Sequence, residues 1–169
     1  LVEEPIASAI GARLPVEEPT ANMVIDIGGG TAEIAIISVG GIVSSKSLKI
    51  AGQRFNEDII KYVKEEFKLL IGEPTAEELK INIGSAMSTD EKMEMAVRGR
   101  DMTTGLPKEV LVKGTHVRTA IHRSLKSLAD EIKALIEEAP PELVGDILQK
   151  GIHLSGGGSL LKGLDKYIE

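Results

Sequence analysis

The sequence predicts an α/β domain that carries a smaller α+β subdomain as an insertion. Apolar residues cluster in short strand-like segments before Gly52, and after it their spacing becomes helical. A long helical pattern begins near Val117 and leads to one further strand pattern near the C-terminal end. Hydrophobic residues make up 42% of the 169 residues, which is ample for a packed core. We therefore expect a core subdomain of residues 1–53 and 116–169 and an inserted subdomain of residues 54–115.

The N-terminal part predicts a short helix followed by an antiparallel three-stranded meander. Pro5 suits the first turn of a helix, and Gly11 can end that helix. Glycines also bound the strand patterns, at Gly28–Gly30 and at the hairpin signal Gly40-Gly41. The expected strands are residues 22–27, 31–39 and 42–50.

The segment after Gly52 predicts two helices and two short strands. Asn56 is the expected N-cap of the first helix, which Gly72 ends. Thr75 and Glu78 form the expected capping box of the second helix. The strands are expected at residues 93–98 and 109–113, on either side of a turn at 104–107.

The C-terminal part predicts a long helix, a short helix, a strand and a terminal helix. The long helix covers residues 117–139, and Pro140-Pro141 ends it. The short helix covers 142–149 and the strand 152–155, after which Ser159 is the expected cap of the terminal helix. The apolar stripe of the long helix consists of Ile121, Leu125, Leu128, Ile132, Leu135 and Ile136.

Composition excludes several classes of function. Twenty Lys and Arg face 26 Asp and Glu, and a net charge of -6 argues against a nucleic-acid partner. The absence of Cys excludes disulfides, thiolate zinc sites and cysteine nucleophiles. No apolar stretch approaches the ~20 residues of a transmembrane helix. The three histidines lack metal-ligand spacing. From the opening Leu-Val-Glu-Glu-Pro we expect no signal peptide in this chain, and we expect the chain to be a piece of a longer protein.

Two glycine runs have the composition of anion-binding loops. Asp26 and Ile27 precede Gly28–Gly30, and Leu154 and Ser155 precede Gly156–Gly158. Backbone N–H groups in such runs can approach a phosphate because no Cβ stands in the way. A carboxylate at the end of a buried strand, such as Asp26, can organise Mg²⁺ beside a phosphate loop. The alternative is that each glycine run only makes a tight turn.

The order of these motifs resembles the actin-like ATPase superfamily, whose fold is ribonuclease H-like, and within it the MreB family of bacterial actins. The resemblance covers nearly the whole chain. In that superfamily two related domains clamp Mg-ATP, and this chain resembles only the second of them. The segments that carry the resemblance are residues 4–11, 26–31, 69–73, 75–80, 99–101, 104–107, 140–143 and 151–159.

The resemblance also implies a role for individual residues. Asp26 would organise Mg²⁺, and Glu4 would position the water that attacks ATP. Glu77 and Lys80 would contact the ribose and adenine. The β- and γ-phosphates would be held by Gly28, Gly29, Gly30 and Thr31. The loop around the adenosine would be Gly156, Gly157, Gly158 and Ser159.

Each assignment has a structural alternative. Glu4 can be an acid favoured by the helix dipole, and Asp26 can cap its own turn. Glu77 and Lys80 can form a surface ion pair worth only ~0.3 kcal/mol.

The sequence departs from the family pattern at two places. Ala32 stands where bacterial actins often carry Thr, and the polar segment Ser88 to Lys92 matches the family poorly.

The function that the resemblance implies is an ATP-dependent, filament-forming cytoskeletal protein that determines rod cell shape. Its partners would be further copies of itself, the cell-wall elongation machinery and the inner membrane surface, at the cytoplasmic face. Slow ATP hydrolysis is expected of the full-length protein and not of this chain alone. The alternatives are the ATPase half of a heat-shock-type chaperone, half of a sugar or acetate kinase, and a binding module without activity.

Overall fold

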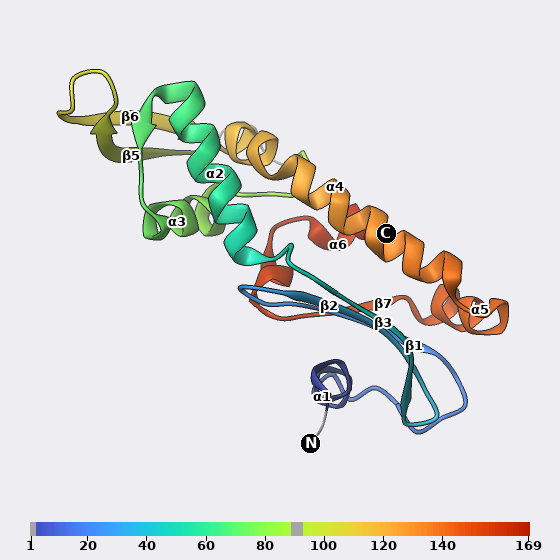
Figure 1. Ribbon diagram of the computed structural model, residues 1–169. Coiled ribbons are helices and arrows are strands. Elements are labelled where there is room, and N and C mark those ends of the chain that lie inside the picture. Colours follow the sequence, from blue (N-terminus) through green and yellow to red (C-terminus); the bar gives the residue numbers. More distant parts are fainter. Residues whose placement is uncertain (1–2, 89–92) are drawn as a thin grey trace. The chain divides into compact units, whose positions relative to one another are not determined.

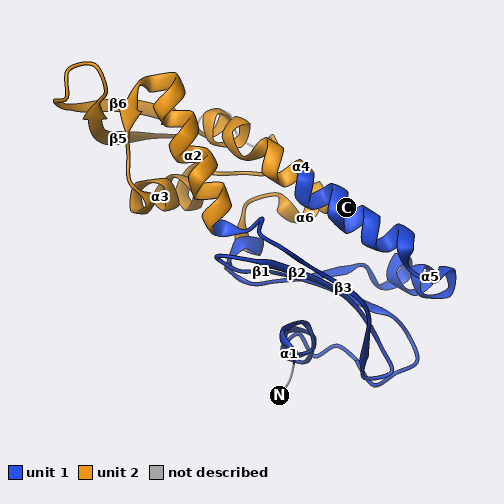
Figure 2. Ribbon diagram, in the orientation of Figure 1, with its two compact units in different colours: residues 1–52, 127–159 blue, residues 53–126, 160–169 orange. Residues whose placement is uncertain are grey.

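The computed structural model describes residues 3–88 and 93–169 (Figure 1). The chain divides into two compact units, coloured separately in Figure 2. Unit 1 comprises residues 1–52 and 127–159, and unit 2 comprises residues 53–126 and 160–169. The expected subdomain boundaries, 1–53 with 116–169 and 54–115, stay a prediction.

Unit 1 is built on a four-stranded sheet in the order β3-β2-β1-β7. Its strands are β1 (Asn22–Ile27), β2 (Ala32–Ser38), β3 (Gly41–Leu48) and β7 (Ile152–Ser155). Antiparallel pairing of β1 with β2 and of β2 with β3 confirms the predicted meander. Strand β7 joins β1 in parallel, and this pairing connects segments far apart in the sequence.

The core of unit 1 explains why β1 and β2 are almost continuously apolar. Residues 23–25 and 34–37 of these central strands are buried. Helix α1 (Glu4–Gly11) packs on the sheet through Ala9, which lies in one cluster with Val24 and Ala35. The helix begins at Glu4, one residue before the start that Pro5 indicated, and ends at Gly11 as predicted. Helix α5 (Pro141–Lys150) also belongs to this unit.

Unit 2 combines helices with a small antiparallel sheet in the order β4-β5-β6. Its strands are β4 (Leu69–Leu70), β5 (Glu94–Asp101) and β6 (Pro107–Lys113). Its helices are α2 (Gly52–Phe67), α3 (Glu73–Ile83) and α6 (Leu164–Ile168). The long helix α4 (Gly114–Glu138) contains the boundary between the two units. Five of the six residues of its predicted stripe are buried, and Ile136 is partly buried.

Three helix ends predicted in the segment after Gly52 are wrong. Helix α2 begins at Gly52, so Asn56 lies inside the helix and not at its N-cap. The same helix ends at Phe67, before Gly72, because Lys68 adopts a left-handed φ of 54°. Helix α3 has Gly72 at its N-cap and no side-chain cap, so the capping box of Thr75 and Glu78 does not form.

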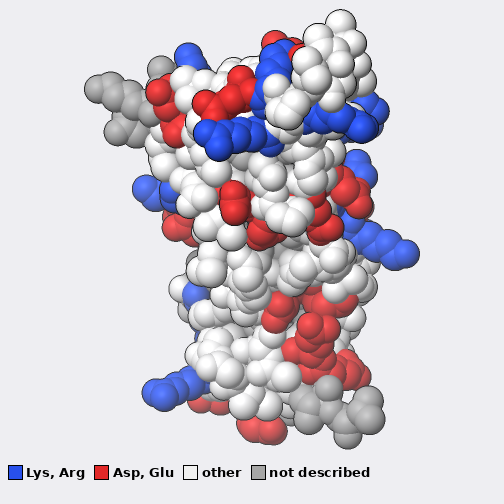
Figure 3. Space-filling model, turned by 90° about the vertical axis from the view of Figure 1, so that its left-hand side faces the viewer, with Lys and Arg blue, Asp and Glu red and all other residues white. Residues whose placement is uncertain are grey.

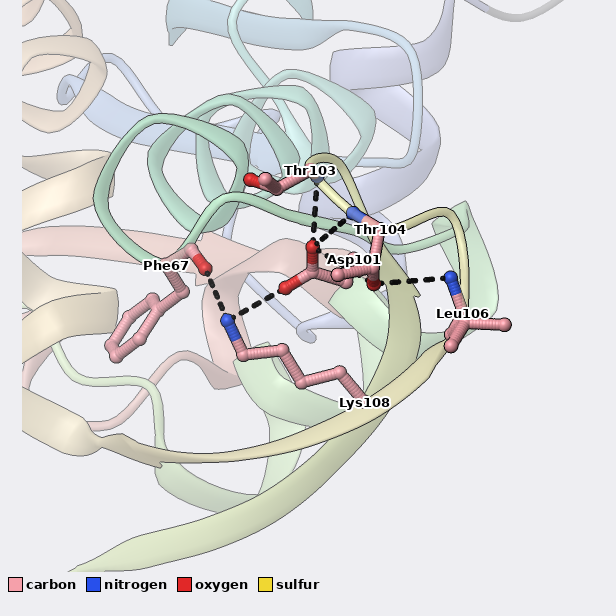
Figure 4. A network of polar contacts seen from close by, with 6 residues as sticks. All are labelled: Phe67, Asp101, Thr103, Thr104, Leu106 and Lys108. Carbon is pink, nitrogen blue, oxygen red and sulfur yellow. Dashed lines mark hydrogen bonds and ion pairs between the residues drawn. The ribbon is translucent and has the colours of Figure 1, made fainter.

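The turn between β5 and β6 is held by the carboxylate of Asp101 (Figure 4). Its Oδ1 accepts hydrogen bonds from the backbone N–H groups of Thr103 at 2.8 Å and Thr104 at 2.9 Å. Its Oδ2 lies 2.9 Å from Nζ of Lys108. The ammonium of Lys108, followed by these two N–H donors, holds the pKa of Asp101 well below its ordinary value. This network explains the segment 101–107 as a rigid turn, and nothing in it requires a ligand.

The polar segment Ser88 to Lys92, which had no predicted role, is largely outside the described structure. Ser88 is exposed, and residues 89–92 lie outside the described residues.

Candidate functional site

Strands β1 and β7 place the two glycine runs at one edge of the sheet. The two strands are parallel neighbours, and Asp26 is paired with Ser155. Gly28–Gly30 follow the end of β1, and Gly156–Gly158 follow the end of β7. Ligands of α/β sheets bind outside the carboxyl ends of parallel strands. The structure therefore brings together two motifs that the sequence separates by more than a hundred residues.

Gly156 packs directly against the end of β1. Its φ is 80°, a conformation that residues with a Cβ rarely adopt. A Cβ at Gly156 would lie 2.4 Å from the carbonyl oxygen of Ile27 and 2.6 Å from Oδ1 of Asp26. A Cβ at Gly158 would lie 2.4 Å from Cγ2 of Ile27. The fold of the chain itself thus requires glycine at these two positions.

Gly29 and Gly157 differ, because the packing of the chain does not require glycine there. Neither has a left-handed φ, and a Cβ on either would meet no atom of the described chain within 4 Å. The space beside their backbone fits the close approach of a phosphate oxygen to main-chain N–H groups. The residues at both loops therefore fit a phosphate-bearing ligand.

The first glycine run also has an internal hydrogen bond. The N–H of Gly28 donates to the carbonyl oxygen of Thr31 at 2.9 Å, which closes the turn between β1 and β2. Gly29, Gly30 and Thr31 are exposed. The donors that this loop can offer to an anion are therefore those of Gly29, Gly30 and Thr31.

The second glycine run does not lead directly into an α-helix. Residues Gly157–Leu160 form a single 3-10 turn, and α6 begins only at Leu164. The expected helix cap at Ser159 is therefore wrong: its hydroxyl donates to the carbonyl oxygen of Gly156 at 2.6 Å. This bond fixes the shape of the loop from within.

Asp26 lies between the two loops and is held by two serines. Its Oδ2 accepts a hydrogen bond from Oγ of Ser155 at 2.9 Å and another from Oγ of Ser8 in α1. Among the described residues these hydroxyls, and not N–H groups of its own turn, are its hydrogen-bond donors. Sequence reasoning missed both serines. Ser155 directly precedes a glycine run, but Ser8 sits in an Ala-rich helix and carries no such signal.

A single carboxylate at a phosphate loop is compatible with Mg²⁺, which keeps several waters and takes its remaining ligands from phosphates. No group of three or more His, Cys, Asp or Glu suited to a metal exists in the part of the chain that the structure describes. A cation at Asp26 would therefore need phosphate oxygens of a bound ligand to supply most of the negative charge around it.

Glu4 begins α1 one helical turn before Ser8. Residues four apart share a helix face, so Glu4 lies on the side of α1 that contacts Asp26. It is exposed, and its carboxylate has no hydrogen bond or ion pair within residues 3–88 and 93–169. Its place in the first turn also suits the helix dipole, so the two interpretations of Glu4 both stay open.

In unit 2, Glu77 and Lys80 form a partly buried ion pair on α3. Nζ of Lys80 lies 2.7 Å from Oε2 of Glu77, and the Lys80 side chain is only 11% exposed. The buried Asn56 donates to the same oxygen through Nδ2 at 2.6 Å. Partial burial raises the pKa of Glu77, but the hydrogen bonds from Lys80 and Asn56 outweigh it and hold this pKa below its ordinary value. The Glu77–Lys80 pair is thus more constrained than a surface ion pair. Asn56 completes a group of three contacting residues, and sequence reasoning missed this role of Asn56.

The amino-acid sequence matches the family described as MreB/Mbl protein over residues 1–169. The chain belongs to the MreB/Mbl family. This confirms the resemblance to bacterial actins that the sequence motifs indicated.

Two curated MreB/Mbl relatives match almost the whole chain. The cell shape-determining protein Mbl of Bacillus subtilis is 45% identical over 168 residues, which cover 99% of this chain and 50% of the relative. The cell shape-determining protein MreB of Escherichia coli is 46% identical over 168 residues, which cover 99% of this chain and 48% of the relative. The chain thus spans about half the length of the curated relatives that it matches.

A solved MreB structure confirms the actin-like α/β fold. The crystal structure of MreB 5 of Spiroplasma citri bound to AMPPNP superposes with a TM-score of 0.94 at 42% identity. The match covers 98% of this chain and 50% of that one. The predicted fold class is therefore correct for this MreB/Mbl chain.

The surface of this MreB/Mbl chain carries charges of both signs. Figure 3 shows both acidic and basic side chains on the face that it presents. Among the exposed described residues, Arg98 and Glu109 form an ion pair at 2.6 Å. Among the described residues, no helix is both long and apolar enough to cross a membrane.

Proposed function

We propose that this chain is the second nucleotide-clamping domain of an ATP-dependent, filament-forming cytoskeletal protein that determines cell shape. The observation that carries the proposal is the meeting of two glycine loops and Asp26 at the ends of β1 and β7. Membership of the MreB/Mbl family along the whole chain supports it. So does the 42% identical MreB 5, whose structure holds the ATP analogue AMPPNP.

The first loop and Asp26 would act on the phosphates. Backbone N–H groups of Gly29 and Gly30, with the hydroxyl of Thr31, would donate to the β- and γ-phosphate oxygens. Mg²⁺, when bound, neutralises charge that develops on these oxygens. Asp26 would orient it, with Ser8 and Ser155 fixing the carboxylate. No other charged side chain bonds to Asp26 among the described residues, so its charge is available for this role.

The remaining site residues would act on the nucleoside and on water. The loop Gly156–Ser159 would lie along the adenosine, and Glu77 with Lys80 would contact the ribose and adenine. Glu4, on the face of α1 that contacts Asp26, would orient a water molecule or take its proton. The reaction class is phosphoryl transfer to water, in which positioning and charge stabilisation supply most of the catalysis.

The proposed partners are those that the resemblance to bacterial actins implies. The chain's full-length protein would assemble with further copies of itself, at the inner membrane surface and with the cell-wall elongation machinery. A chaperone or sugar-kinase half is the weaker alternative, because the MreB/Mbl family matches all 169 residues. The proposed location is the cytoplasmic face of the membrane.

The first test compares the full-length protein with this chain alone. We expect slow release of phosphate from ATP by the full-length protein and none measurable by residues 1–169. The loops at β1 and β7 supply donors from one side only, and phosphoryl transfer needs charge stabilisation around the phosphate with water excluded. A phosphate-release assay on both proteins at equal concentration checks this. Turnover by residues 1–169 at the full-length rate, abolished by Glu4→Ala, would show that one domain suffices.

A further inference from the structure

Asn56 is a polar residue in the apolar stripe of α2. It is 3% exposed, and Phe55, Ile59 and Val63 of the same helix are also buried. Because α2 begins at Gly52, the side chain of Asn56 does not cap the helix. An amide buried among apolar side chains is costly unless its polar atoms are paired. The fold by itself therefore gives no reason for Asn at this position.

The side-chain hydrogen bond of Asn56 gives that reason. Nδ2 of Asn56 donates to Oε2 of Glu77 at 2.6 Å. An ionised carboxylate only accepts, so this contact fixes which end of the amide faces Glu77. The other end, Oδ1, is buried with no donor among the described residues. A buried acceptor without a donor is destabilising, so Asn56 costs stability in order to supply one donor to Glu77.

Both donors to Glu77 reach the same carboxylate oxygen. Nδ2 of Asn56 and Nζ of Lys80 each lie within 2.7 Å of Oε2. The side chain of Glu77 is still 44% exposed, so its carboxylate remains accessible to a ligand. Glu77 is thus held ionised and anchored through Oε2, and its partly exposed carboxylate can accept a hydrogen bond from a ligand.

We propose that Asn56 is a positioning residue that holds Glu77 as the acceptor for a ribose hydroxyl, and so makes nucleotide binding depend on that hydroxyl. This inference rests on the proposed function. A carboxylate held in place accepts a hydrogen bond from a ribose hydroxyl specifically. When the ribose carbon carries no hydroxyl, the carboxylate loses that hydrogen bond. The ligand class is a ribonucleotide, as opposed to its dideoxy analogue. Asn56 itself need not touch the nucleotide.

The test uses the full-length protein and two nucleotides, Mg-ATP and Mg-2′,3′-dideoxyATP. For the wild type, we expect ATP to bind at least about tenfold more tightly than the dideoxy analogue. Asn56→Leu, which has a similar size and no polar atoms, should reduce this preference about tenfold without lowering the melting temperature. Asn82→Leu, at an exposed position of α3, is the matched control and should leave the preference unchanged.

Two further variants separate positioning from a merely structural role. Glu77→Gln should reduce the preference as Asn56→Leu does, and the double variant should add little, because Asn56 acts through Glu77. Asn56→Asp places a second carboxyl group against Glu77, and the pair then shares a proton at low pH. Its preference for ATP should therefore recover as the pH falls and be lost as the pH rises. The wild type should show no such trend.

The possible failures are distinguishable. If the wild type binds no ATP, the proposed function is wrong and this inference falls with it. If the wild type prefers ATP and Asn56→Leu keeps that preference, only the inference is wrong. An equal loss of affinity for both nucleotides, with a lower melting temperature, would also overturn the inference, since it would make Asn56 a structural residue.

Discussion

Replacing Gly156 by Ala is expected to abolish tight Mg-ATP binding by the full-length protein and to destabilise it. The new Cβ would meet the carbonyl oxygen of Ile27 at 2.4 Å and Oδ1 of Asp26 at 2.6 Å, at a left-handed φ of 80°. The left-handed conformation alone costs about 1–2 kcal/mol, and the overlap adds a similar amount or more. The loop would therefore shift away from β1 and displace Asp26. Equilibrium binding of Mg-AMPPNP and a thermal melt without nucleotide are the measurements.

Two other glycines provide matched comparisons. Gly157→Ala adds a Cβ where no chain atom lies within 4 Å, so its melting temperature should stay unchanged while affinity falls about tenfold. Gly145→Ala, in α5, also adds a Cβ in open space. It should keep full affinity and gain roughly 0.5–1 kcal/mol of stability from helix propensity. If Gly156→Ala and Gly157→Ala both bind Mg-AMPPNP with wild-type affinity, the loop that follows β7 only makes a turn.

Replacing Asp26 by Ala is expected to lower ATP hydrolysis by the full-length protein about 100-fold, with weaker Mg-dependent binding. Loss of one charge-stabilising or metal-organising group typically raises the barrier by about 3 kcal/mol. The fold should survive, because the hydroxyls of Ser8 and Ser155 can rotate toward water in this half-buried place. Phosphate release and the Mg²⁺ dependence of ATP binding check the prediction.

The control for this variant is Asp130→Ala, because Asp130 is exposed on α4. It should hydrolyse ATP at the wild-type rate. If Asp26→Ala retains both Mg-ATP affinity and hydrolysis, Asp26 is a structural residue bound by its two serines. The proposed site would then be wrong at its centre.

The elements that the sequence predicts correctly are those whose signals are local. Glycine turns on either side of apolar strands predicted the meander, whose β1 bounds, residues 22–27, are observed without change. The parallel pairing of β1 with β7 is not local, since it joins Asp26 to Ser155 across most of the chain. From the residues alone, the two glycine runs were therefore separate candidates, and only their family resemblance joined them.

The errors at helix ends have two physical causes, one local and one long-range. Thr75 and Glu78 have the spacing of a capping box, but Pro74 fits the first turn so well that the helix begins earlier, after Gly72. Asn56 is a residue type favoured at N-caps, and no local signal reveals that its amide is buried against Glu77. Such long-range polar contacts depend on packing between helices, which single-sequence patterns do not contain.

Electron microscopy of the full-length protein tests most directly whether this chain belongs to an ATP-driven filament subunit, as proposed. Samples with Mg-ATP, without nucleotide, and with Mg-ATP but carrying Asp26→Ala would be imaged at one protein concentration. We predict filaments in the first sample and few or none in the other two, because the nucleotide loops at β1 and β7 would be filled only in the first. A full-length protein that stays monomeric in Mg-ATP, or that forms the same filaments in all three samples, would contradict the account.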